Sequence, residues 1–435
     1  MNDSVSNTHR NRPGDDVPLD LVVIGLGYVG LPLAQEAVRS GLSVVGLDVS
    51  ESLAESVNAG RSHVDDLADA DIGQMVADGF RATTDASVLD DANAVVICVP
   101  TPLSDEGGPD LGAVLSAART VAAHVHPGML VVLESTTYPG TTDEEVRPLL
   151  EASGLRAGVD FHLAFSPERI DPGNPLFGMR NTPKVVGGHT PQCTEAAVAL
   201  YSRFVDTVVP AAGTREAEMA KLLENTYRHI NIALVNEMAK FCHELDIDLW
   251  DVIRCASTKP FGFQPFYPGP GVGGHCIPID PNYLSFRVRD QLGYPFRFVE
   301  LAQEINSSMP EYVAHRTKSI LQQRGTDIAA STVLLLGVTY KPDIADQRES
   351  PAVPVAEALR ALGAHVIFHD PMVDVWRLGS ENLTRVADLD VALAEADVSI
   401  LLQANRDYDL EHLASTARVL FDTRGASTAD TTVRL

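Results

Sequence analysis

Cys276 lies in a segment rich in glycine and proline, GPGVGGHCIPIDP, at residues 269–281. Glycine has no Cβ, so a substrate can approach the backbone there and amide N–H groups can point toward it. The thiolate is the reactive form of cysteine, and amide donors or a nearby cation lower the thiol pKa. This setting predicts that Cys276 is a nucleophile. The alternative is a small residue in a structural loop.

Two neighbours of Cys276 have side chains that could take part in its chemistry. His275 could act on the thiol, although adjacent residues often point apart. Asp280 could orient a water molecule or balance a cation, or it could cap the turn before Pro281. Three other cysteines, Cys98, Cys242 and Cys255, are expected to be packing residues, because apolar neighbours or a helical setting surround them.

A lysine and an asparagine, Lys221 and Asn225, are four residues apart in a predicted helix, so they share one face. Together they offer a cation and an amide donor, which suits a developing oxyanion. By spacing alone, a solvated lysine beside an ordinary helical asparagine is the better explanation, because such pairs are common on any helix.

Gly25-Leu26-Gly27-Tyr28-Val29-Gly30 matches the pattern G-x-G-x-x-G after a predicted strand and before a predicted helix. The three glycines permit a tight turn, close approach of a pyrophosphate, and close packing of helix on strand. Asp48 ends the next strand and can accept hydrogen bonds from both ribose hydroxyls, which favours NAD over NADP. Pro100 and Thr101 follow a later strand, at the sheet edge where such cofactors lie, although a proline that simply ends the strand explains them as well.

The composition excludes several classes of function. The 435 residues include 33 basic and 59 acidic side chains, a net charge of -26, so binding to nucleic acid or to an anionic membrane surface is not expected. No apolar run approaches the roughly 20 residues that a membrane span needs. The polar N-terminus lacks an apolar stretch, so we do not expect it to be a signal peptide. The five cysteines form no CxxC pair, so no metal site and no disulfide framework are indicated, and we expect a cytoplasmic protein with reduced thiols.

Apolar segments alternate with helical ones in the first half of the chain, at 21–25, 43–48, 94–100, 129–135, 160–166, 183–188 and 205–210. Such strands indicate a parallel sheet covered on both faces. Residues 214–245 contain neither glycine nor proline and predict one long helix, and alternation returns at residue 332. We therefore predict an α/β protein with two Rossmann-like doubly wound domains, joined by a long central helix and a helical middle domain. The expected boundaries are a disordered leader at 1–19 and domains at 20–212, 213–325 and 326–435.

The chain resembles the nucleotide-sugar 6-dehydrogenases, the family of the UDP-glucose and GDP-mannose dehydrogenases, from about residue 20 onward. The motifs that carry the resemblance, in chain order, are GLGYVG, CVPTPL, ESTTYPGTT, SPERIDPGN, AKLLENTYRHINIALVNE, FYPGPGVGGHCIPIDP and TYKPDIADQRESPA. GGHCIPIDP with FYPGPG is similar to the branch that acts on UDP-N-acetylhexosamines. The substrate that fits this resemblance best is UDP-N-acetylglucosamine, followed by its mannosamine isomer, with UDP-glucose as a further alternative.

The resemblance implies a role for each matching residue. It implies that Cys276 is the nucleophile, Lys221 and Asn225 the oxyanion partners, Glu168 an acid/base, and Thr136 the hydroxyl that holds a water molecule, with Asp280 beside them. Cofactor contacts would come from Gly25, Gly27, Tyr28, Val29, Gly30, Asp48, Pro100, Thr101, Ser135, Thr136 and Arg348. Substrate contacts would come from Glu168, Lys221, Asn225, Phe266, Tyr267, Gly271 and Lys341. The C-terminal domain would bind the UDP-sugar, and the long helix would form a homodimer or a higher oligomer.

The implied reaction is a four-electron oxidation of a sugar CH2OH group to a carboxylate with two NAD+, which would supply surface polysaccharide synthesis. An aldehyde has no alkoxide to expel hydride, but its thiohemiacetal with Cys276 does, and water then releases the acid from the thioester. Glu168 would suit as the base for that water if burial raises its pKa toward neutrality. A two-electron hydroxyacid dehydrogenase and a non-catalytic sensor of NAD or nucleotide sugars are the alternatives.

Overall fold

The computed structural model describes residues 19–64, 67–104, 108–171, 174, 176–274 and 277–435. The chain forms two compact units. The first contains the residues up to Pro102 together with Asp110–Lys221, and the second contains Leu103–Pro109 together with Leu222–Leu435. Of the predicted leader, residues 1–18 lie outside the described residues, and Leu19 already belongs to the first strand.

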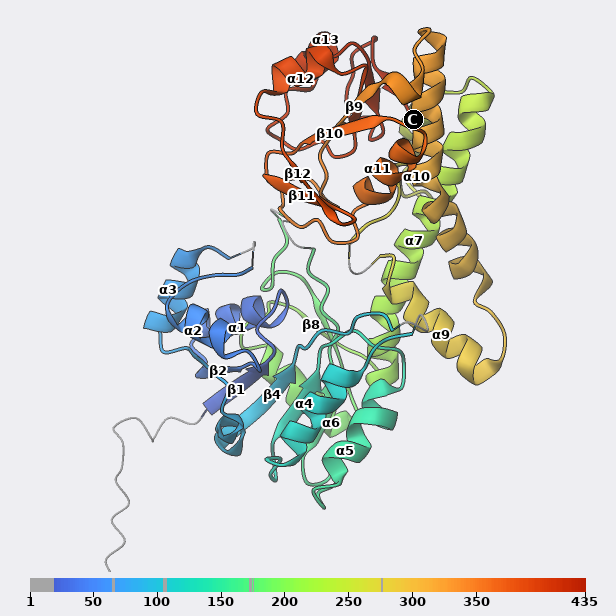
Figure 1. Ribbon diagram of the computed structural model, residues 1–435. Helices are drawn as coiled ribbons and strands as arrows, with labels where there is room; N and C mark the ends of the chain where they lie inside the picture. Colours follow the sequence, from blue (N-terminus) through green and yellow to red (C-terminus); the bar gives the residue numbers. More distant parts are fainter. Residues whose placement is uncertain (1–18, 65–66, 105–107, 172–173, 175, 275–276) are drawn as a thin grey trace, which may run out of the picture. The chain divides into compact units, whose positions relative to one another are not determined.

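The first unit is built on an eight-stranded sheet with the strand order β3-β2-β1-β4-β5-β6-β7-β8 (Figure 1). Its elements are β1 (Leu19–Ile24), α1 (Gly30–Arg39), β2 (Val44–Leu47), α2 (Glu51–Asn58), α3 (Asp69–Ala77), β3 (Arg81–Thr83), the 3-10 helix η1 (Ala86–Asp91), β4 (Ala92–Ile97), α4 (Gly112–Ala122), β5 (Leu130–Leu133), the π-helical turn η2 (Thr142–Val146), α5 (Arg147–Glu151), β6 (His162–Phe165), β7 (Lys184–Gly188), α6 (Pro191–Tyr201) and β8 (Val208–Pro210).

Alternate side chains of these strands point to opposite faces, and both faces are apolar. Val23, for example, packs in the cluster that α1, α3 and α6 cover, whereas its neighbour Val22 packs in the cluster that α4 and α5 cover. Burial on both faces explains why the strands are apolar throughout rather than alternating with polar residues.

One strand pair differs from the expected parallel sheet, because β6 and β7 run antiparallel. A parallel neighbour needs a crossover connection, which is usually a helix, whereas an antiparallel neighbour does not. The described residues between Phe165 and Lys184 form no helix, so the connection from β6 to β7 is consistent with their antiparallel pairing.

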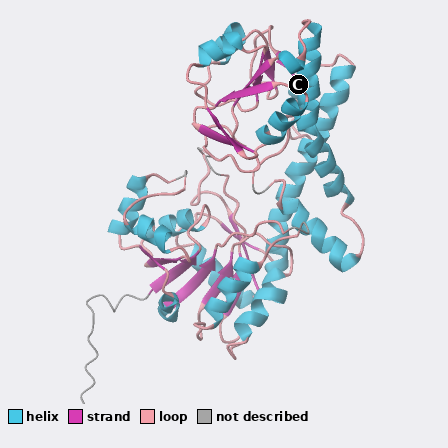
Figure 2. Ribbon diagram, viewed as in Figure 1, coloured by secondary structure: helices cyan, strands magenta, loops and turns pink. Residues whose placement is uncertain are grey.

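The second unit combines helices with a smaller α/β region (Figure 2). The long helix α7 (Thr214–Glu244) begins in the first unit and continues into the second, as one uninterrupted helix. The elements that follow are α8 (Leu249–Ser257), α9 (Asp280–Leu292), α10 (Arg297–Gln323), the 3-10 helix η3 (Ile328–Ala330), β9 (Thr332–Leu336), α11 (Ala352–Ala361), β10 (His365–His369), β11 (Val375–Leu378), β12 (Glu381–Thr384), α12 (Leu389–Glu395), β13 (Val398–Leu401), α13 (Leu410–Thr416), β14 (Leu420–Asp422) and β15 (Val433–Arg434).

The sheet of the second unit is parallel, with the order β10-β9-β13-β14-β15. Helices α10 and α11 cover one face and α12 and α13 cover the other. Strands β11 and β12 form a separate antiparallel hairpin that the sequence did not indicate. The predicted fold class, with two doubly wound regions and a long helix between them in sequence, is confirmed. In the part of the chain that the structure describes, no helix is long and apolar enough to cross a membrane.

Candidate active site

The glycine motif after β1 has the geometry that a dinucleotide requires. Gly25 has a φ of +89°, and a Cβ on it would lie 2.8 Å from the carbonyl oxygen of Cys98. A Cβ on Gly30 would lie 1.9 Å from the carbonyl oxygen of Gly25, so only glycine lets the helix start so close to the strand. A Cβ on Gly27 would meet nothing within 4 Å. Gly27 is therefore the position where space is left for a ligand.

Asp48 connects this loop to the second strand. Its Oδ2 accepts a hydrogen bond from the backbone N–H of Leu26 at 2.9 Å, and its Oδ1 accepts one from the N–H of Ser50 at 2.9 Å. The carboxylate is thereby held beside the turn and remains half-buried. A fixed carboxylate beside an open glycine is what an adenosine ribose needs, so the residues of this loop fit NAD. Tyr28, 40% exposed, and the half-buried Val29 complete the turn.

A second predicted cofactor segment lies at the ends of β4 and β5. The Ser135 hydroxyl donates a hydrogen bond to the carbonyl oxygen of Val99 at 2.7 Å. This contact holds the segment with exposed Pro100 and half-buried Thr101 against the segment that continues to Thr136. Both segments follow parallel strands of one sheet, at the edge where the glycine motif also lies.

Lys221 and Thr136 lie together in the first unit. The Lys221 ammonium donates a hydrogen bond to the Thr136 hydroxyl oxygen at 2.6 Å, and the lysine is only 8% exposed. A solvated surface lysine, the alternative left open by the sequence, is therefore wrong. A buried cation beside a hydroxyl can stabilise a developing negative charge.

Glu168 lies in the same group, with its side chain about 10% exposed. Its Oε1 accepts hydrogen bonds from the backbone N–H groups of Arg169 at 2.7 Å and Ile170 at 2.6 Å. Burial raises the pKa of this carboxyl, but the Lys184 ammonium, these N–H donors and Lys221 outweigh burial, so the pKa lies below its usual value. Burial alone would raise the pKa of Glu168 toward neutrality, but this condition is not met. Glu168 is a carboxylate at neutral pH.

Three residues that were not predicted from the sequence lie beside this group: Lys184 contacts Glu168, and Glu134 and Tyr201 contact Lys184. Lys184, at the start of β7, is buried between Glu168 and Glu134, and Tyr201 of α6 donates a hydrogen bond to Glu134. In the sequence Lys184 is a lone lysine before an apolar strand and Glu134 a lone glutamate after one. Their one feature in the sequence that could have drawn attention is that each is a charged residue next to an apolar segment.

The cysteine loop belongs to the second unit, and His275 and Cys276 lie outside the described residues. The glycines before them pack against protein. A Cβ on Gly273 would lie 2.6 Å from the carbonyl oxygen of Glu349, and Gly274, with a φ of +88°, lies against the Tyr340 ring. Gly271 has a φ of +139° and lies against Pro351. These glycines allow the loop to pack closely against the segments around Tyr340 and Pro351.

Asn225 and Asp280 meet within the second unit. The Asn225 amide donates a hydrogen bond to Asp280 Oδ2 at 2.6 Å, and both side chains are buried. Asp280 is the first residue of α9, four residues after Cys276. The contact fixes which way the amide points, so the second N–H of Asn225 has a defined direction.

A chain of buried amides anchors the other end of the cysteine loop. Asn236 of α7 accepts a hydrogen bond from the backbone N–H of Gly269 at 2.9 Å and donates one to Asn306 of α10 at 2.9 Å. Neither asparagine was predicted as a site residue from the sequence. Nearby, Phe266 contacts the Tyr227 ring edge-on, and Tyr267 stacks on Trp250.

The remaining predicted ligands lie on the segment after β9. Lys341 is half-buried. Arg348 is exposed, and its guanidinium forms two hydrogen bonds with Asp346, at 2.9 and 2.6 Å. The guanidinium of Arg348 could form a similar pair of hydrogen bonds with a phosphate only after its hydrogen bonds with Asp346 break.

The other cysteines differ from one another. Burial, and then the Glu134 carboxylate, raise the pKa of the Cys98 thiol well above its usual value, which makes it inert. Cys242 is also buried. Cys255, expected in the core, is exposed, because it lies on the outer face of α8 beside Arg254.

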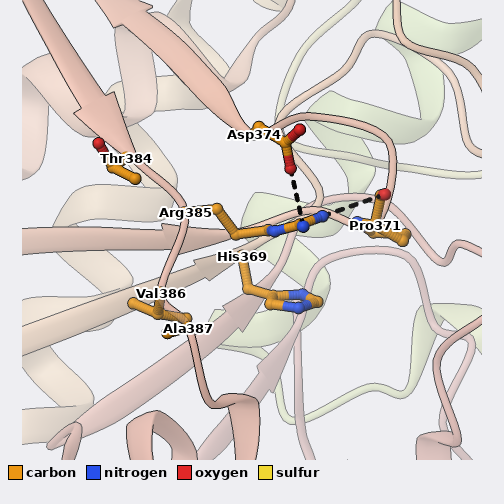
Figure 3. A pocket seen from close by; sticks show the side chains of 7 residues that line it. All are labelled: His369, Pro371, Asp374, Thr384, Arg385, Val386 and Ala387. Carbon is orange, nitrogen blue, oxygen red and sulfur yellow. Dashed lines mark hydrogen bonds and ion pairs between the residues drawn. The ribbon is translucent and has the colours of Figure 1, made fainter.

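The described residues of the second unit line at least two cavities that the sequence did not indicate. One, of about 450 Å³, is lined by residues of the cysteine loop, α7, α10 and the start of α11, among them His229, Gly271, Asn306 and Pro351. The other, of about 560 Å³, is lined by residues at and just after the ends of β10 and β12 (Figure 3). There Arg385 lies beside His369 and bonds to Asp374 and to the carbonyl oxygen of Pro371.

Three family models match successive parts of the chain. They describe the NAD binding domain, the central domain and the UDP binding domain of the UDP-glucose/GDP-mannose dehydrogenase family, at residues 19–205, 215–308 and 334–429. The chain belongs to this family.

Relatives of known name and structure agree with the assignment. The chain is 34% identical to UDP-N-acetyl-D-mannosamine dehydrogenase of Salmonella typhi over 93% of its own length and 98% of that protein. It is 35% identical to NDP-N-acetyl-D-galactosaminuronic acid dehydrogenase of Ralstonia nicotianae, over 93% and 95%. The solved UDP-D-ManNAc dehydrogenase of Pyrococcus horikoshii is similar with a TM-score of 0.85 and 32% identity, over 95% of this chain and 98% of that one.

As a member of the UDP-glucose/GDP-mannose dehydrogenase family, the protein is an NAD-dependent oxidoreductase that acts on a UDP-sugar. The predicted family, enzyme class and cofactor are confirmed. Membership favours an enzyme over the non-catalytic sensor.

Proposed function

We propose that the protein oxidises the C6 hydroxymethyl group of a UDP-N-acetylhexosamine to a carboxylate, with Cys276 as the covalent nucleophile. The sugar alcohol, water and two NAD+ become the sugar carboxylate, two NADH and three protons. The observation that carries the proposal is the group formed by Lys221, Thr136 and Glu168, in which a buried ammonium, a hydroxyl and an ionised carboxylate lie together. NAD+, when bound, accepts the hydride in each of the two oxidations.

In this proposal the protein residues handle the protons and the developing charges. Lys221 stabilises the alkoxide of the first oxidation and the oxyanion of the later intermediates. The Cys276 thiolate adds to the aldehyde to give a thiohemiacetal, and the second oxidation leaves a thioester. Glu168 accepts a proton from the water that attacks the thioester, a C–O bond forms, and the C–S bond breaks with release of the thiolate.

Asn225, Asp280 and Thr136 take supporting roles. Asp280 fixes the Asn225 amide at 2.6 Å, so that the amide can present its other N–H to an oxyanion. Thr136, which accepts the Lys221 hydrogen bond, keeps its own O–H to orient a water molecule. The proposal also assigns Lys341 to the nucleotide sugar and Arg348 to the cofactor, with Phe266, Tyr267 and Gly271 as substrate contacts.

The identity of the sugar is proposed at the level of UDP-N-acetylhexosamine. The names of two relatives favour N-acetylmannosamine, whereas the resemblance of the GGHCIPIDP motif favours N-acetylglucosamine. The two differ in configuration at C2. Initial rates of NADH formation with UDP-N-acetylmannosamine, UDP-N-acetylglucosamine and UDP-glucose decide between them, and good turnover of UDP-glucose alone would overturn the branch assignment.

The number of NADH molecules formed per sugar tests the reaction itself. The proposal requires two NADH for each uronic acid formed. A two-electron dehydrogenase gives one NADH and a stable carbonyl product. One NADH per sugar, with no acid by mass spectrometry, would overturn the proposal.

We also propose that the protein forms a homodimer or a larger homo-oligomer, is cytoplasmic, and supplies sugar acids for surface polysaccharide. The support for self-association is an apolar stripe on the long helix, defined by Leu223, Tyr227, Leu234 and Phe241, all of which are exposed in the single chain. Their spacing of four and seven residues places them along one side of α7. A helix with such a side usually packs against another element.

A further inference from the structure

A buried lysine joins two carboxylates beneath the proposed active site. The Lys184 ammonium lies 3.1 Å from Glu134 Oε1 and 3.3 Å from Glu168 Oε2. The lysine side chain is 4% exposed, and it also lies over the Tyr201 ring at 5.2 Å. A lysine of the first unit is therefore fixed at its charged end by two glutamates from two different strand ends.

The two carboxylates are held differently. Glu168 has two backbone N–H donors on Oε1 besides Lys184. Glu134 accepts from Lys184 and the Tyr201 hydroxyl through Oε1, and its Oε2 contacts no hydrogen-bond donor among the described residues. One ammonium cannot balance two buried carboxylates, so the better-solvated one keeps its charge and the other takes up a proton more readily. Burial raises the pKa of Glu134, in agreement with this asymmetry.

The charged and titratable groups that act on Glu168 come from several elements. Lys184 comes from β7 and Lys221 from α7. Glu134 follows β5, Tyr201 belongs to α6, and the Cys98 thiol follows β4. The thiol and the phenol have pKa values raised by burial, so both are neutral. Among the described residues, the charge around Glu168 is therefore set mainly by the two ammonium groups and by the competing Glu134 carboxyl.

We infer that Lys184 is a positioning residue of the reaction: its buried ammonium ties Glu168 to Glu134 and holds Glu168 as a fixed carboxylate ready to accept a proton from water. Lys184 acts through Glu168 and touches no reacting atom. The inference rests on the proposed function, in which Glu168 is the base for thioester hydrolysis. According to this inference, Glu168 stays ionised because of a lysine at the start of another strand, β7.

The test compares variants in single-turnover acid release followed across pH. Lys184→Met removes the cation and keeps the apolar stem. The acid limb of its pH–rate profile is expected to move to higher pH. The rate of acid release should fall about tenfold to hundredfold at neutral pH and recover in alkali. The KM for the UDP-sugar should change little. Lys184→Arg keeps a cation and should restore most of the wild-type profile.

A second comparison covers the case in which Lys184→Met does not fold, since it leaves two buried carboxylates without their ammonium. Glu134→Gln and Glu134→Gln/Lys184→Met differ only in the cation, and the double variant should have its acid limb at higher pH. A loss that is equal at every pH, or coincident limbs in this pair, would overturn the inference.

Glu168→Gln separates the two levels of the argument. If this variant releases acid at the wild-type rate, the base assigned in the proposed function is wrong, whatever Lys184 does. If Glu168→Gln loses acid release while the Lys184 variants keep an unshifted limb, only the inference about Lys184 is wrong.

Discussion

Asp48 shows how a single residue can prepare a cofactor site before any cofactor binds. Both of its carboxylate oxygens accept backbone N–H groups, from Leu26 and Ser50, at 2.9 Å each. The side chain is thus fixed, and its charge opposes a 2′-phosphate at the same place. The fixed carboxylate therefore favours NAD in two ways, because it can bind the ribose hydroxyls and it repels the 2′-phosphate of NADP.

Replacing Asp48 by alanine should weaken NAD and relax the discrimination against NADP. Loss of two hydrogen bonds to ribose is expected to raise the KM for NAD by about tenfold to hundredfold, at roughly 1–3 kcal/mol in all. Initial rates with both cofactors check this. Asp85→Ala, an exposed carboxyl in the same unit, is the control and should change neither constant. An unchanged cofactor preference in Asp48→Ala would contradict the assignment.

Helix α7 and the loop after β5 are held together by Glu218, a residue to which no part in the reaction is assigned. Glu218, on the first turns of α7, accepts hydrogen bonds from the N–H groups of Gly140 and Thr142 and from the Thr142 hydroxyl, at 2.6 to 2.9 Å. Thr136 lies on the same segment a few residues earlier, and Lys221 lies one turn further along α7. Glu218 therefore fixes the loop against the helix close to the Lys221–Thr136 contact.

The pH dependence of stability should show the titration of Glu218. Burial raises its pKa from 4.5 to about 7. A raised pKa in the folded state gives stability that is present below the unfolded pKa and is lost as pH rises through the folded one. The loss amounts to about 3 kcal/mol between about pH 4.5 and pH 7. Glu218→Gln cannot titrate, so its stability deficit relative to wild type should shrink over this range in chemical denaturation. A deficit that is constant with pH would contradict the raised pKa.

The glycine motif gives a matched pair of substitutions at the scale of the β1–α1 unit. Gly27→Ala adds a Cβ where nothing lies within 4 Å, so the melting temperature should hold while the KM for NAD rises at least about tenfold. Gly30→Ala places its Cβ 1.9 Å from a backbone oxygen and should cost about 1–3 kcal/mol of stability. Thermal melts and NAD titrations of both variants test this. Equal loss of stability in the two would contradict the division of roles.

The elements with strong periodicity were predictable, and the contacts between them were not. The apolar strands, the helix over 214–245 and the glycine motif each carry their signal within a short stretch of sequence. The antiparallel return at β6–β7 and the hairpin β11–β12 depend on connections rather than on periodicity. Lys184 and Glu134 are about fifty residues apart in sequence, and only the sheet order β5-β6-β7 brings them together.

The same limit applies to the cysteine loop. Its four glycines were visible, but the sequence did not show that Tyr340, Glu349 and Pro351 fill the space beside three of them. Likewise the exposure of Cys255 depends on which face of α8 packs inward, because Leu249 and Ile253 are buried whereas Cys255 lies on the exposed side.

At the scale of the whole molecule, a net charge of -26 opposes chance association, so contact between copies needs a specific apolar surface. The stripe on α7 defined above provides such a surface. Leu234→Asp, at a residue 53% exposed, should therefore shift the mass measured by light scattering toward the monomer. Val159→Asp, at an equally apolar residue 66% exposed in the first unit, is the control. A Leu234→Asp protein with the wild-type mass would contradict the proposed interface.

The covalent step at Cys276 is tested most directly by the mass of the enzyme itself during turnover. Glu168→Gln, mixed with the UDP-sugar and excess NAD+ and quenched in acid, should carry the sugar acyl group on the peptide that contains Cys276. Two NADH should form per enzyme, and Cys276→Ala should show no such adduct. Wild-type yields of uronic acid from Cys276→Ala, with no adduct in either variant, would contradict the account.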